Sequence, residues 1–374
     1  MRIEILAEMS TRYGSNEDYV LAGGGNTSCK DETTLYVKGS GTQLATIRPE
    51  QFVAMDLQKL REMLQKQYPT DDDAREAEAL RDMMAAKLPG QEQMRPSVEA
   101  ILHALFPYQY VLHVHPALVN GLSCAKQGEA LCASLFGGRV VWIPLTKPGF
   151  ILAAACQKAF AQSEGSTGEF PHVAILQNHG IFVAADTVEE IDKAMDRVME
   201  TLEARVKEKP DLSEVKFDRE LARAIAPALR VLYSGEGQAD AIFCTNRMVQ
   251  EFVAGAKAME PLMQPFTPDH IVYCKDTPLL VEVGADYRAA MESYAQTRGY
   301  LPKIVVVRGL GFFALGGSRK EADIAQKLFL DAMKVAVYAK SFGGPLPLPE
   351  SFTRFILNWE FENYRQKVAL SGGE

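Results

Sequence analysis

The sequence has few of the residues on which disulfide frameworks and metal centres depend. Its 374 residues include only six cysteines and six histidines. The cysteines are scattered and form no CxxC pair, which predicts buried, reduced thiols rather than disulfides or a zinc knuckle. Because histidines are scarce, a catalytic metal site would have to be built from a small set of candidates.

Long apolar runs, a signal peptide and basic clusters are also missing. No apolar stretch approaches the roughly 18 residues of a membrane-spanning helix, and the first 14 residues are too polar and acidic for a signal peptide. The net charge of −8 argues against nucleic-acid and anionic-membrane partners. With 47% hydrophobic and 24% charged residues, we expect a globular enzyme. Because neither a signal peptide nor a membrane-spanning run is seen, we expect this enzyme in the cytoplasm.

The length predicts two domains of ordinary size, each able to bury a core. The polar segment KPDLSEVKFD, residues 209–218, is the best candidate for the boundary. We therefore expect one domain at 1–212 and a second at 213–374.

Two closely spaced histidines are the main chemical feature of the predicted first domain. His113 and His115 lie in the segment VLHVHPALVNG. If VLHVH is a strand, its two-residue period directs both rings to one face, which is the beginning of a metal site. A catalytic site of this kind needs a third protein ligand and an open position. His179, in LQNHGIF between two apolar runs, is the best candidate.

Upstream, two glycine-rich segments, GGGNTS and KGSG, could cradle an anion with their backbone N–H groups. A simple hairpin turn would also explain the first of them. The segment RPSVEAILHALFP predicts a helix with Ser97 as N-cap and Glu99 in its first turn. Compensation of the helix dipole would explain Glu99, but the helix leads directly to the histidine strand. His103 lies on the face of Glu99, where helix packing would explain it.

Other patterns predict a helix at 2–13, two helices within 49–88 and two strands within 172–186. Part of this order recurs. Residues 302–333 parallel residues 171–200, and the offset of 131 places Leu310 at the position of His179.

A second parallel, between the segments PDHIVYCKDTPLL and PYQYVLHVHPALV, is read at an offset of 160. It places Tyr273 and Lys275 at the positions of the paired histidines. We therefore predict a diverged repeat without the metal ligands, which packs on the first copy, caps its sheet or forms an oligomer interface. Alternatively, Lys275 and Arg308 would contact an anionic ligand.

Five segments together resemble the class II aldolase/adducin family, which includes zinc-dependent fuculose- and rhamnulose-phosphate aldolases. GGGNTSCK, VKGSG, RPSVEAILHALFP, HVHPALVNG and QNHGIF match its signature blocks in order across residues 20–190. The sequences of these segments are most similar to the aldolase part of bifunctional aldolase/dehydrogenase proteins. No GxGxxG motif lies between a strand and a helix, so we expect no dehydrogenase unit in these residues.

The resemblance implies a three-layer α/β fold with a largely antiparallel central sheet, followed by the diverged copy, and a homo-oligomer. It also assigns the site. The implied zinc ligands are His113, His115 and His179, and the implied general acid/base is Glu99. The residues implied to contact the substrate phosphate are Gly25, Asn26, Ser40, Gly41 and Ser97.

The phosphate pocket departs from the short aldolases at two positions. Gly23 and Val98 stand where those enzymes carry hydroxyl side chains. The substrate is therefore expected to be either a sugar phosphate or a sugar acid. The family also uses a tyrosine as proton donor, which the sequence does not identify among its thirteen.

The expected reaction is retro-aldol cleavage, in which zinc acts as a Lewis acid toward an enediolate and Glu99 moves its proton. Three imidazoles would equally suit manganese, cobalt or iron. The same site could serve an epimerase, decarboxylase or dehydratase. An adducin-like interaction protein without catalysis is the alternative from another class.

Overall fold

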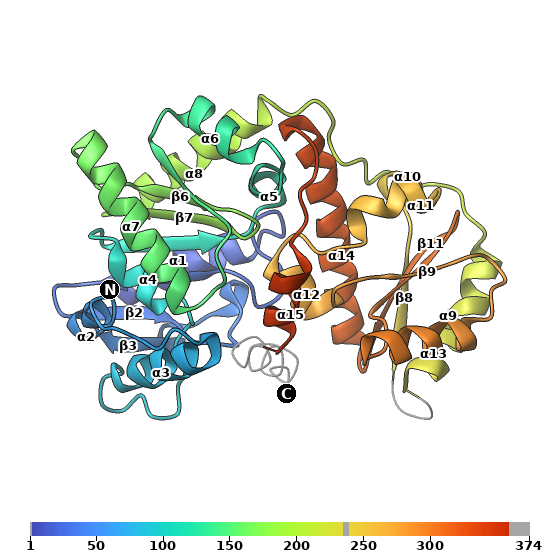
Figure 1. The fold of residues 1–374 in the computed structure, drawn as a ribbon, viewed down its shortest axis with the longest axis horizontal. Helices are drawn as coiled ribbons and strands as arrows, with labels where there is room; N and C mark the ends of the chain where they lie inside the picture. The colour runs from blue at the N-terminus through green and yellow to red at the C-terminus, as the bar shows by residue number, and fades with distance from the viewer. Residues whose placement is uncertain (1, 235–238, 359–374) are drawn as a thin grey trace. The chain divides into compact units, whose positions relative to one another are not determined.

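The computed structural model describes residues 2–234 and 239–358 (Figure 1). Within these residues the chain forms two compact units. The first comprises residues 2–123 and 127–205, and the second comprises residues 124–126 and 206–358. Among the described residues, no helix is long and apolar enough to cross a membrane.

The first unit is built on a seven-stranded sheet in the order β3-β2-β1-β4-β7-β6-β5. Only β5 and β6 run parallel; every other neighbouring pair is antiparallel. This confirms the predicted α/β fold with a largely antiparallel sheet. The strands are β1 (Asn26–Lys30), β2 (Thr34–Lys38), β3 (Phe52–Asp56), β4 (Tyr110–Val114), β5 (Val140–Ile143), β6 (Val173–Leu176) and β7 (Gly180–Ala185).

Helices cover both faces of this sheet, as alternate residues of β1 show. The hydroxyl of Thr27 bonds with Ser10 of α1, whereas the next residue, Ser28, bonds with His103 of α4. Because successive strand residues face opposite ways, α1 and α4 lie in different layers. The helices are α1 (Arg2–Gly14), α2 (Leu57–Met63), α3 (Asp72–Ala85), α4 (Ala100–Leu105), α5 (Ala117–Ser123), α6 (Gly128–Phe136), α7 (Phe150–Thr167) and α8 (Val188–Glu203).

The region 49–88 contains the two predicted helices, α2 and α3, but also a strand that was not predicted. Residues 52–56 form β3, the edge strand beside β2. Asp56 ends this strand and caps α2 by accepting the N–H of Lys59. The short apolar run FVAMD fits strand and helix equally well, and pairing with β2 decides between them.

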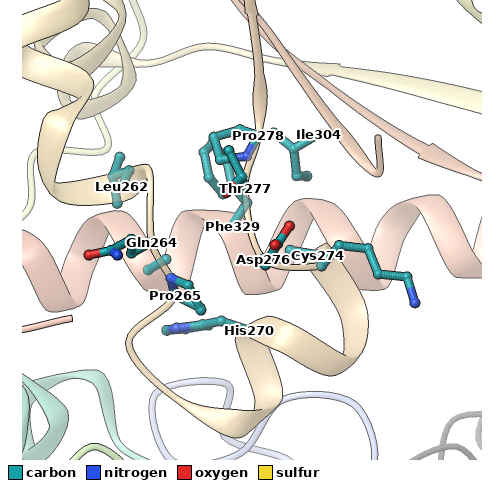
Figure 2. A pocket seen from close by; sticks show the side chains of 12 residues that line it. Leu262, Gln264, Pro265, His270, Cys274, Asp276, Thr277, Pro278, Ile304 and Phe329 are labelled. Atoms are coloured by element: carbon teal, nitrogen blue, oxygen red, sulfur yellow. The ribbon is translucent and has the colours of Figure 1, made fainter. Parts of the chain in front are cut away.

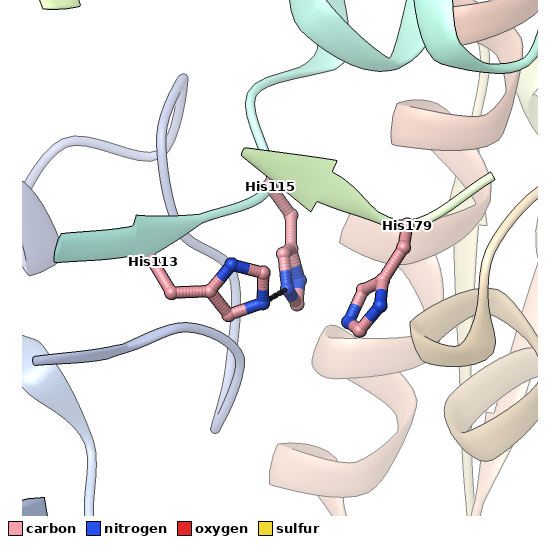
Figure 3. A group of neighbouring side chains, drawn as sticks. All are labelled: His113, His115 and His179. Atoms are coloured by element: carbon pink, nitrogen blue, oxygen red, sulfur yellow. Dashed lines mark hydrogen bonds between the residues drawn. The ribbon is translucent and has the colours of Figure 1, made fainter. Parts of the chain in front are cut away.

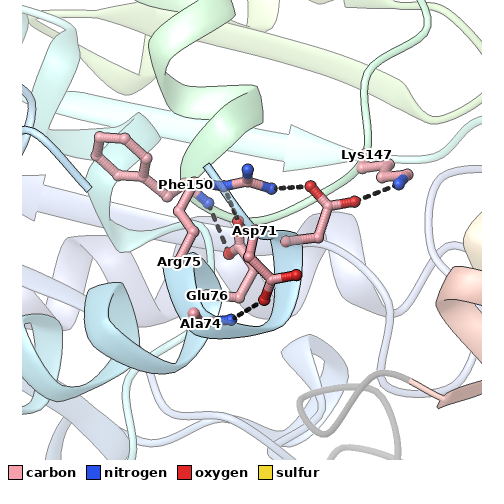
Figure 4. A network of polar contacts seen from close by, with 7 residues as sticks. Asp71, Ala74, Arg75, Glu76, Lys147 and Phe150 are labelled. Carbon is pink, nitrogen blue, oxygen red and sulfur yellow. Dashed lines mark hydrogen bonds and ion pairs between the residues drawn. The ribbon is translucent and has the colours of Figure 1, made fainter. Parts of the chain in front are cut away.

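The long helix α7 is anchored by the side chains of α3 (Figure 4). The N–H of Phe150, at its first position, donates to the buried carboxylate of Glu76 at 3.0 Å. Arg75 bonds both Glu76 and Asp72, and Lys147 bonds the second oxygen of Asp72. A carboxylate is favourable at this site because the N-terminus of a helix carries partial positive charge.

The second unit has a four-stranded sheet in the order β8-β11-β10-β9. Its strands are β8 (Asp240–Cys244), β9 (Leu279–Val281), β10 (Ile304–Val307) and β11 (Gly311–Gly316). Its helices are α9 (Arg219–Ser234), α10 (Arg247–Val253), α11 (Ala256–Met259), α12 (Pro268–Cys274), α13 (Tyr287–Arg298), α14 (Arg319–Ala339) and α15 (Glu350–Asn358).

This sheet repeats the order and the strand directions of β4-β7-β6-β5. The turns between the equivalent hairpin strands repeat as well. The N–H of Gln177 bonds Ile143, and 131 residues later the N–H of Arg308 bonds Val281. The next residue in each turn has a positive φ, 56° at Asn178 and 71° at Gly309. The offset of 131 therefore joins equivalent backbone positions.

The predicted offset of 160 is wrong, because residues 268–274 form helix α12 instead of a strand. β8 takes the place of β4: Phe313 pairs with Phe243 as Phe182 pairs with His113. The counterpart of His113 is therefore Phe243, and not Tyr273. Neither this residue nor the counterpart of His179 offers a metal donor, and the diverged repeat stays a prediction.

The second unit also contains a small cavity beside α12, shown in Figure 2. The cavity measures about 20 Å³, which is room for a water molecule or two. His270 lines it, with Nε2 2.9 Å from the carboxylate of Asp331. Nδ1 of His270 is buried and has no hydrogen-bond partner among the described residues.

Candidate metal centre

Three histidines converge in the first unit (Figure 3). His113 lies in β4, His115 follows that strand, and His179 lies in the turn between β6 and β7. One ring nitrogen of each lies within 4.8 Å of the others, and no other such group of His, Cys, Asp or Glu is found among the described residues. The structure thus brings together the three residues that were predicted as metal ligands.

The turn that carries His179 is held by its backbone. Asn178 has the left-handed conformation, which asparagine tolerates better than most residues, and its N–H bonds the carbonyl of Ser123. The N–H of His179 bonds back to Leu176 at 3.1 Å. A Cβ atom on Gly180 would lie 2.6 Å from Cδ2 of His115, so only glycine lets the rings approach this closely.

The ring of His113 is fixed in one orientation. Its Nδ1 lies 3.0 Å from the carbonyl oxygen of Ile181, and the ring stacks on Phe182. Donation from Nδ1 to the carbonyl leaves the lone pair on Nε2, which faces the other histidines. Burial holds the pKa of His113 well below its usual value. The ring is therefore neutral, as a metal ligand must be.

Glu99 completes the cluster. Its Oε2 lies 3.3 Å from Nε2 of His113, and its Oε1 lies 3.5 Å from Nε2 of His179. Burial by itself would raise the pKa of this carboxyl, but any positive charge in the histidine cluster and the hydrogen bond donated by Asn26 outweigh burial and hold the pKa below its usual range. Glu99 is therefore a carboxylate at neutral pH.

The donor set fits a divalent transition metal. Tetrahedral zinc with bonds of about 2.0–2.1 Å separates its nitrogen ligands by roughly 3.3–3.4 Å. Nε2 of His113 and Nε2 of His115 lie 2.9 Å apart, so a small ring adjustment meets this spacing. Oε1 of Glu99 is buried and has no hydrogen-bond partner in the described part of the chain. A cation would interact favourably with this oxygen.

Sequence comparison identifies the fold family. Residues 4–206 match the Class II Aldolase and Adducin N-terminal domain, and residues 220–365 match the second domain of class II aldolases. The chain belongs to the class II aldolase family. It is also 23% identical to YuxG of Bacillus subtilis strain 168, described as an uncharacterized oxidoreductase, over 98% of this chain and 58% of that protein. The chain thus spans just over half the length of this relative.

Solved class II aldolase structures cover about half of the chain. The N-terminal class II aldolase domain of a Thermoplasma acidophilum protein is 26% identical, covers 54% of this chain and 92% of its own, and has a TM-score of 0.46. L-fuculose 1-phosphate aldolase from Glaciozyma antarctica PI12 is 14% identical, covers 55% of this chain and 71% of its own, and has a TM-score of 0.36.

The start of α4 in this member of the class II aldolase family differs from the prediction. The helix begins at Ala100, and Glu99 rather than Ser97 occupies the N-cap position. Glu99 makes no side-chain cap bond, because its carboxylate faces the histidines and Asn26. Ser97 lies outside the helix, where its hydroxyl accepts the N–H of Glu99 at 3.3 Å. The correction moves Glu99 from the first turn to the helix entrance.

The segments predicted to bind phosphate meet beside Glu99. A bridge between Gly39 and Pro96 joins them, and the N–H of Ser97 bonds the carbonyl of Lys38 at 3.0 Å. Ser40 and Gly41 lie on one side of this bridge, and Ser97 lies on the other. Their role toward a phosphate stays a prediction.

Gly25 and Asn26 have structural tasks of their own. A Cβ atom on Gly25 would lie 2.8 Å from the carbonyl oxygen of His113, so this glycine lets its loop approach β4. The Asn26 amide donates to Glu99 at 2.6 Å, and its oxygen accepts from His103. His103, which packing alone would have explained, thus touches the site through Asn26. Its four-residue spacing from Glu99 was the signal in the sequence.

Proposed function

We propose that the protein is a zinc-dependent aldolase that cleaves a sugar phosphate or sugar acid by retro-aldol chemistry. The observation that carries this proposal is a buried Glu99 oxygen, which accepts no hydrogen bond from the described residues and lies beside three converging histidines. A buried carboxylate without a functional role would cost folding free energy, because a buried charge is stable only with a partner.

The three histidines would hold the metal, which when bound supplies positive charge to the oxygens of the substrate. Glu99 has the base form at neutral pH, since its pKa lies below its usual range. Its Oε1 points toward His179 and is available to take up or return a substrate proton, while Oε2 is held by Asn26. One carboxylate can therefore serve as base and then as acid.

The anionic group of the substrate would bind near Ser40, Gly41 and Ser97, where the two predicted segments meet. We also propose a cytoplasmic homo-oligomer. The predicted second domain, at 213–374, would be a diverged repeat without the metal donors.

A substrate panel tests the proposal. Ketose 1-phosphates and sugar acids are incubated with the full chain, with and without a chelator, and the products are followed by NMR. We expect two carbonyl fragments from one substrate class and no reaction with the chelator. If the product is an epimer, carbon dioxide or a dehydrated sugar, the protein is instead an epimerase, a decarboxylase or a dehydratase. No turnover in any sample would favour a non-catalytic interaction protein.

A further inference from the structure

Behind Glu99 lies an uninterrupted row of buried polar side chains. Ser28 Oγ lies 2.7 Å from Nδ1 of His103, whose Nε2 bonds the oxygen of Asn26. The nitrogen of Asn26 in turn bonds Oε2 of Glu99 at 2.6 Å. Ser28 and His103 are fully buried, and Asn26 and Glu99 are 6% and 5% exposed. The row runs from the sheet interior to the metal centre.

The direction of every bond in the row follows from the Asn26 amide. Its nitrogen can only donate and lies 2.6 Å from Oε2 of Glu99, and its oxygen can only accept and faces Nε2 of His103. His103 therefore carries its proton on Nε2. Nδ1 of His103 is then an acceptor, and the hydroxyl of Ser28 must donate to it. Four side chains thus have a single consistent arrangement of protons.

We propose that Ser28, His103 and Asn26 are positioning residues. Each donates a hydrogen bond to the next residue in the direction of Glu99, and this one-way relay of hydrogen bonds holds the Glu99 carboxylate toward the candidate metal centre. The proposal rests on the proposed function, because it takes Glu99 to be the group that moves the proton. It also gives Asn26 a different task from the predicted phosphate contact. A rotated Asn26 amide would direct its oxygen at the carboxylate, which the relay prevents.

The surroundings of His103 support this assignment. Burial lowers the pKa of His103 to about 3, so the ring stays neutral and keeps one donor and one acceptor at working pH. An apolar side chain would fill the same space without the cost of burying two ring nitrogens. Both ring nitrogens are satisfied, as a fully connected network requires.

The proton position can be measured without any assay of activity. The full chain is labelled with ¹⁵N in its histidines, and the His103 resonances are assigned by comparison with His103→Gln. We expect a neutral ring with the proton on Nε2 throughout the pH range around neutrality. A proton on Nδ1, or a ring that becomes cationic near pH 6.5, would overturn the relay whether or not the protein proves to be an aldolase.

Two substitutions of His103 separate positioning from packing. In His103→Gln the amide nitrogen can take the place of Nε2 and still donate to Asn26. In His103→Asn the shorter amide reaches only the Ser28 side. We expect His103→Asn to lower kcat about tenfold or more, with KM and bound metal unchanged, and His103→Gln to restore most of it. Equal kcat values for the two variants would contradict the relay.

A pair of serine variants provides the control. These variants also test the proposal if a His103 variant fails to fold. Ser28→Ala removes the hydroxyl that fixes the ring, whereas Ser10→Ala removes an equally buried hydroxyl that bonds Thr27 on the other face of β1. Both should lower Tm to a similar extent. Only Ser28→Ala should lower kcat per bound metal and mix the two ring forms in the NMR spectrum. If Ser10→Ala lowers kcat equally, the effect is structural and the proposal fails.

Discussion

At the scale of single residues, a substitution of Glu99 tests turnover separately from metal binding. In the proposed site the three histidines would provide the nitrogen donors, and the Glu99 carboxylate lies 3.3 Å from His113 and 3.5 Å from His179. Glutamine has the same shape and can still accept from Asn26, but it cannot take up a proton. We therefore expect Glu99→Gln to abolish turnover and to retain about one zinc per chain by elemental analysis. Loss of zinc with normal turnover per remaining metal would refute the acid/base assignment.

The sequence revealed some residues of the site and not others for a physical reason. Alternation along a strand assigns a face, so the convergence of His113 and His115 could be predicted. The bond between Asn26 and His103 joins residues 77 positions apart and depends on how β1 pairs with β4. The N-cap at Glu99 was missed because Ser97 has the stronger intrinsic preference for that position, and contacts of the carboxylate override it.

At the scale of elements, the β6–β7 hairpin positions His179, and its counterpart in the second unit supplies a matched control. Cβ atoms on Gly180 and Gly311 would lie 2.6 and 2.5 Å from the carbonyl oxygens of Val114 and Cys244. Alanine at either glycine should therefore destabilise its hairpin, by about 1–3 kcal/mol.

Only Gly180→Ala should also weaken zinc binding, because only that hairpin carries a histidine. Tm and zinc content of the two variants, measured side by side, check this prediction. Equal loss of zinc in both variants would contradict it.

A buried lysine at the end of β1, bonded to carbonyl groups that follow α4, makes stability depend on pH. Lys30 donates to the carbonyl oxygens of Phe106 and Tyr108 at 3.0 and 2.8 Å. Burial, together with the charge of Arg61, lowers the pKa of Lys30 from 10.5 to about 7. Between these two values the unfolded chain binds more protons, so this group makes the free energy of unfolding rise with pH. Below pH 7 the lysine is charged in both states and contributes no slope.

Lys30→Met should flatten that dependence between pH 7 and 10. The difference from the unsubstituted protein would be on the order of a few kcal/mol over the full window. Urea unfolding at several pH values measures it. An unchanged slope in the variant would show that Lys30 stays charged in the folded protein, held by its two carbonyl acceptors.

Helices with clear capping residues can be predicted from the sequence, whereas short apolar runs do not reveal whether they form a strand or a helix. The segment FVAMD is a strand because β2 lies beside it, a fact that its own residues do not encode. The segment 268–274 was misjudged although its signals were present. Thr267 accepts from His270 as N-cap, and Pro268 occupies the first turn, both typical of a helix start. Similarity to the histidine strand had outweighed them.

At the scale of the whole molecule, the two units share one strand arrangement, and only one of them brings histidines together. The sequence predicted the two-part organisation from length and from the recurring hairpin. The sequence alignment at an offset of 160 is wrong, because similarity over 13 residues is weaker evidence for equivalent positions than the pairing of strands in the sheet. The paired strands locate Phe243 and Leu310 at the positions where the first unit has His113 and His179.

Metal binding should therefore protect the two units differently. A ligand that binds only the folded state raises the free energy of local opening around its site. Added zinc should slow amide hydrogen exchange in the turn 177–179 and in β4. The equivalent turn 308–310 should exchange at an unchanged rate. Equal protection of both turns would indicate a metal site in the second unit or a global effect.

The central claim is that His113, His115 and His179 hold one divalent metal. Elemental analysis of freshly purified full chain, beside His179→Ala, tests it most directly. The account predicts about one transition-metal ion per chain in the unsubstituted protein, restored by added zinc after chelation, and a clear loss in the variant. No transition metal in the unsubstituted protein, and none taken up from excess zinc, would contradict it.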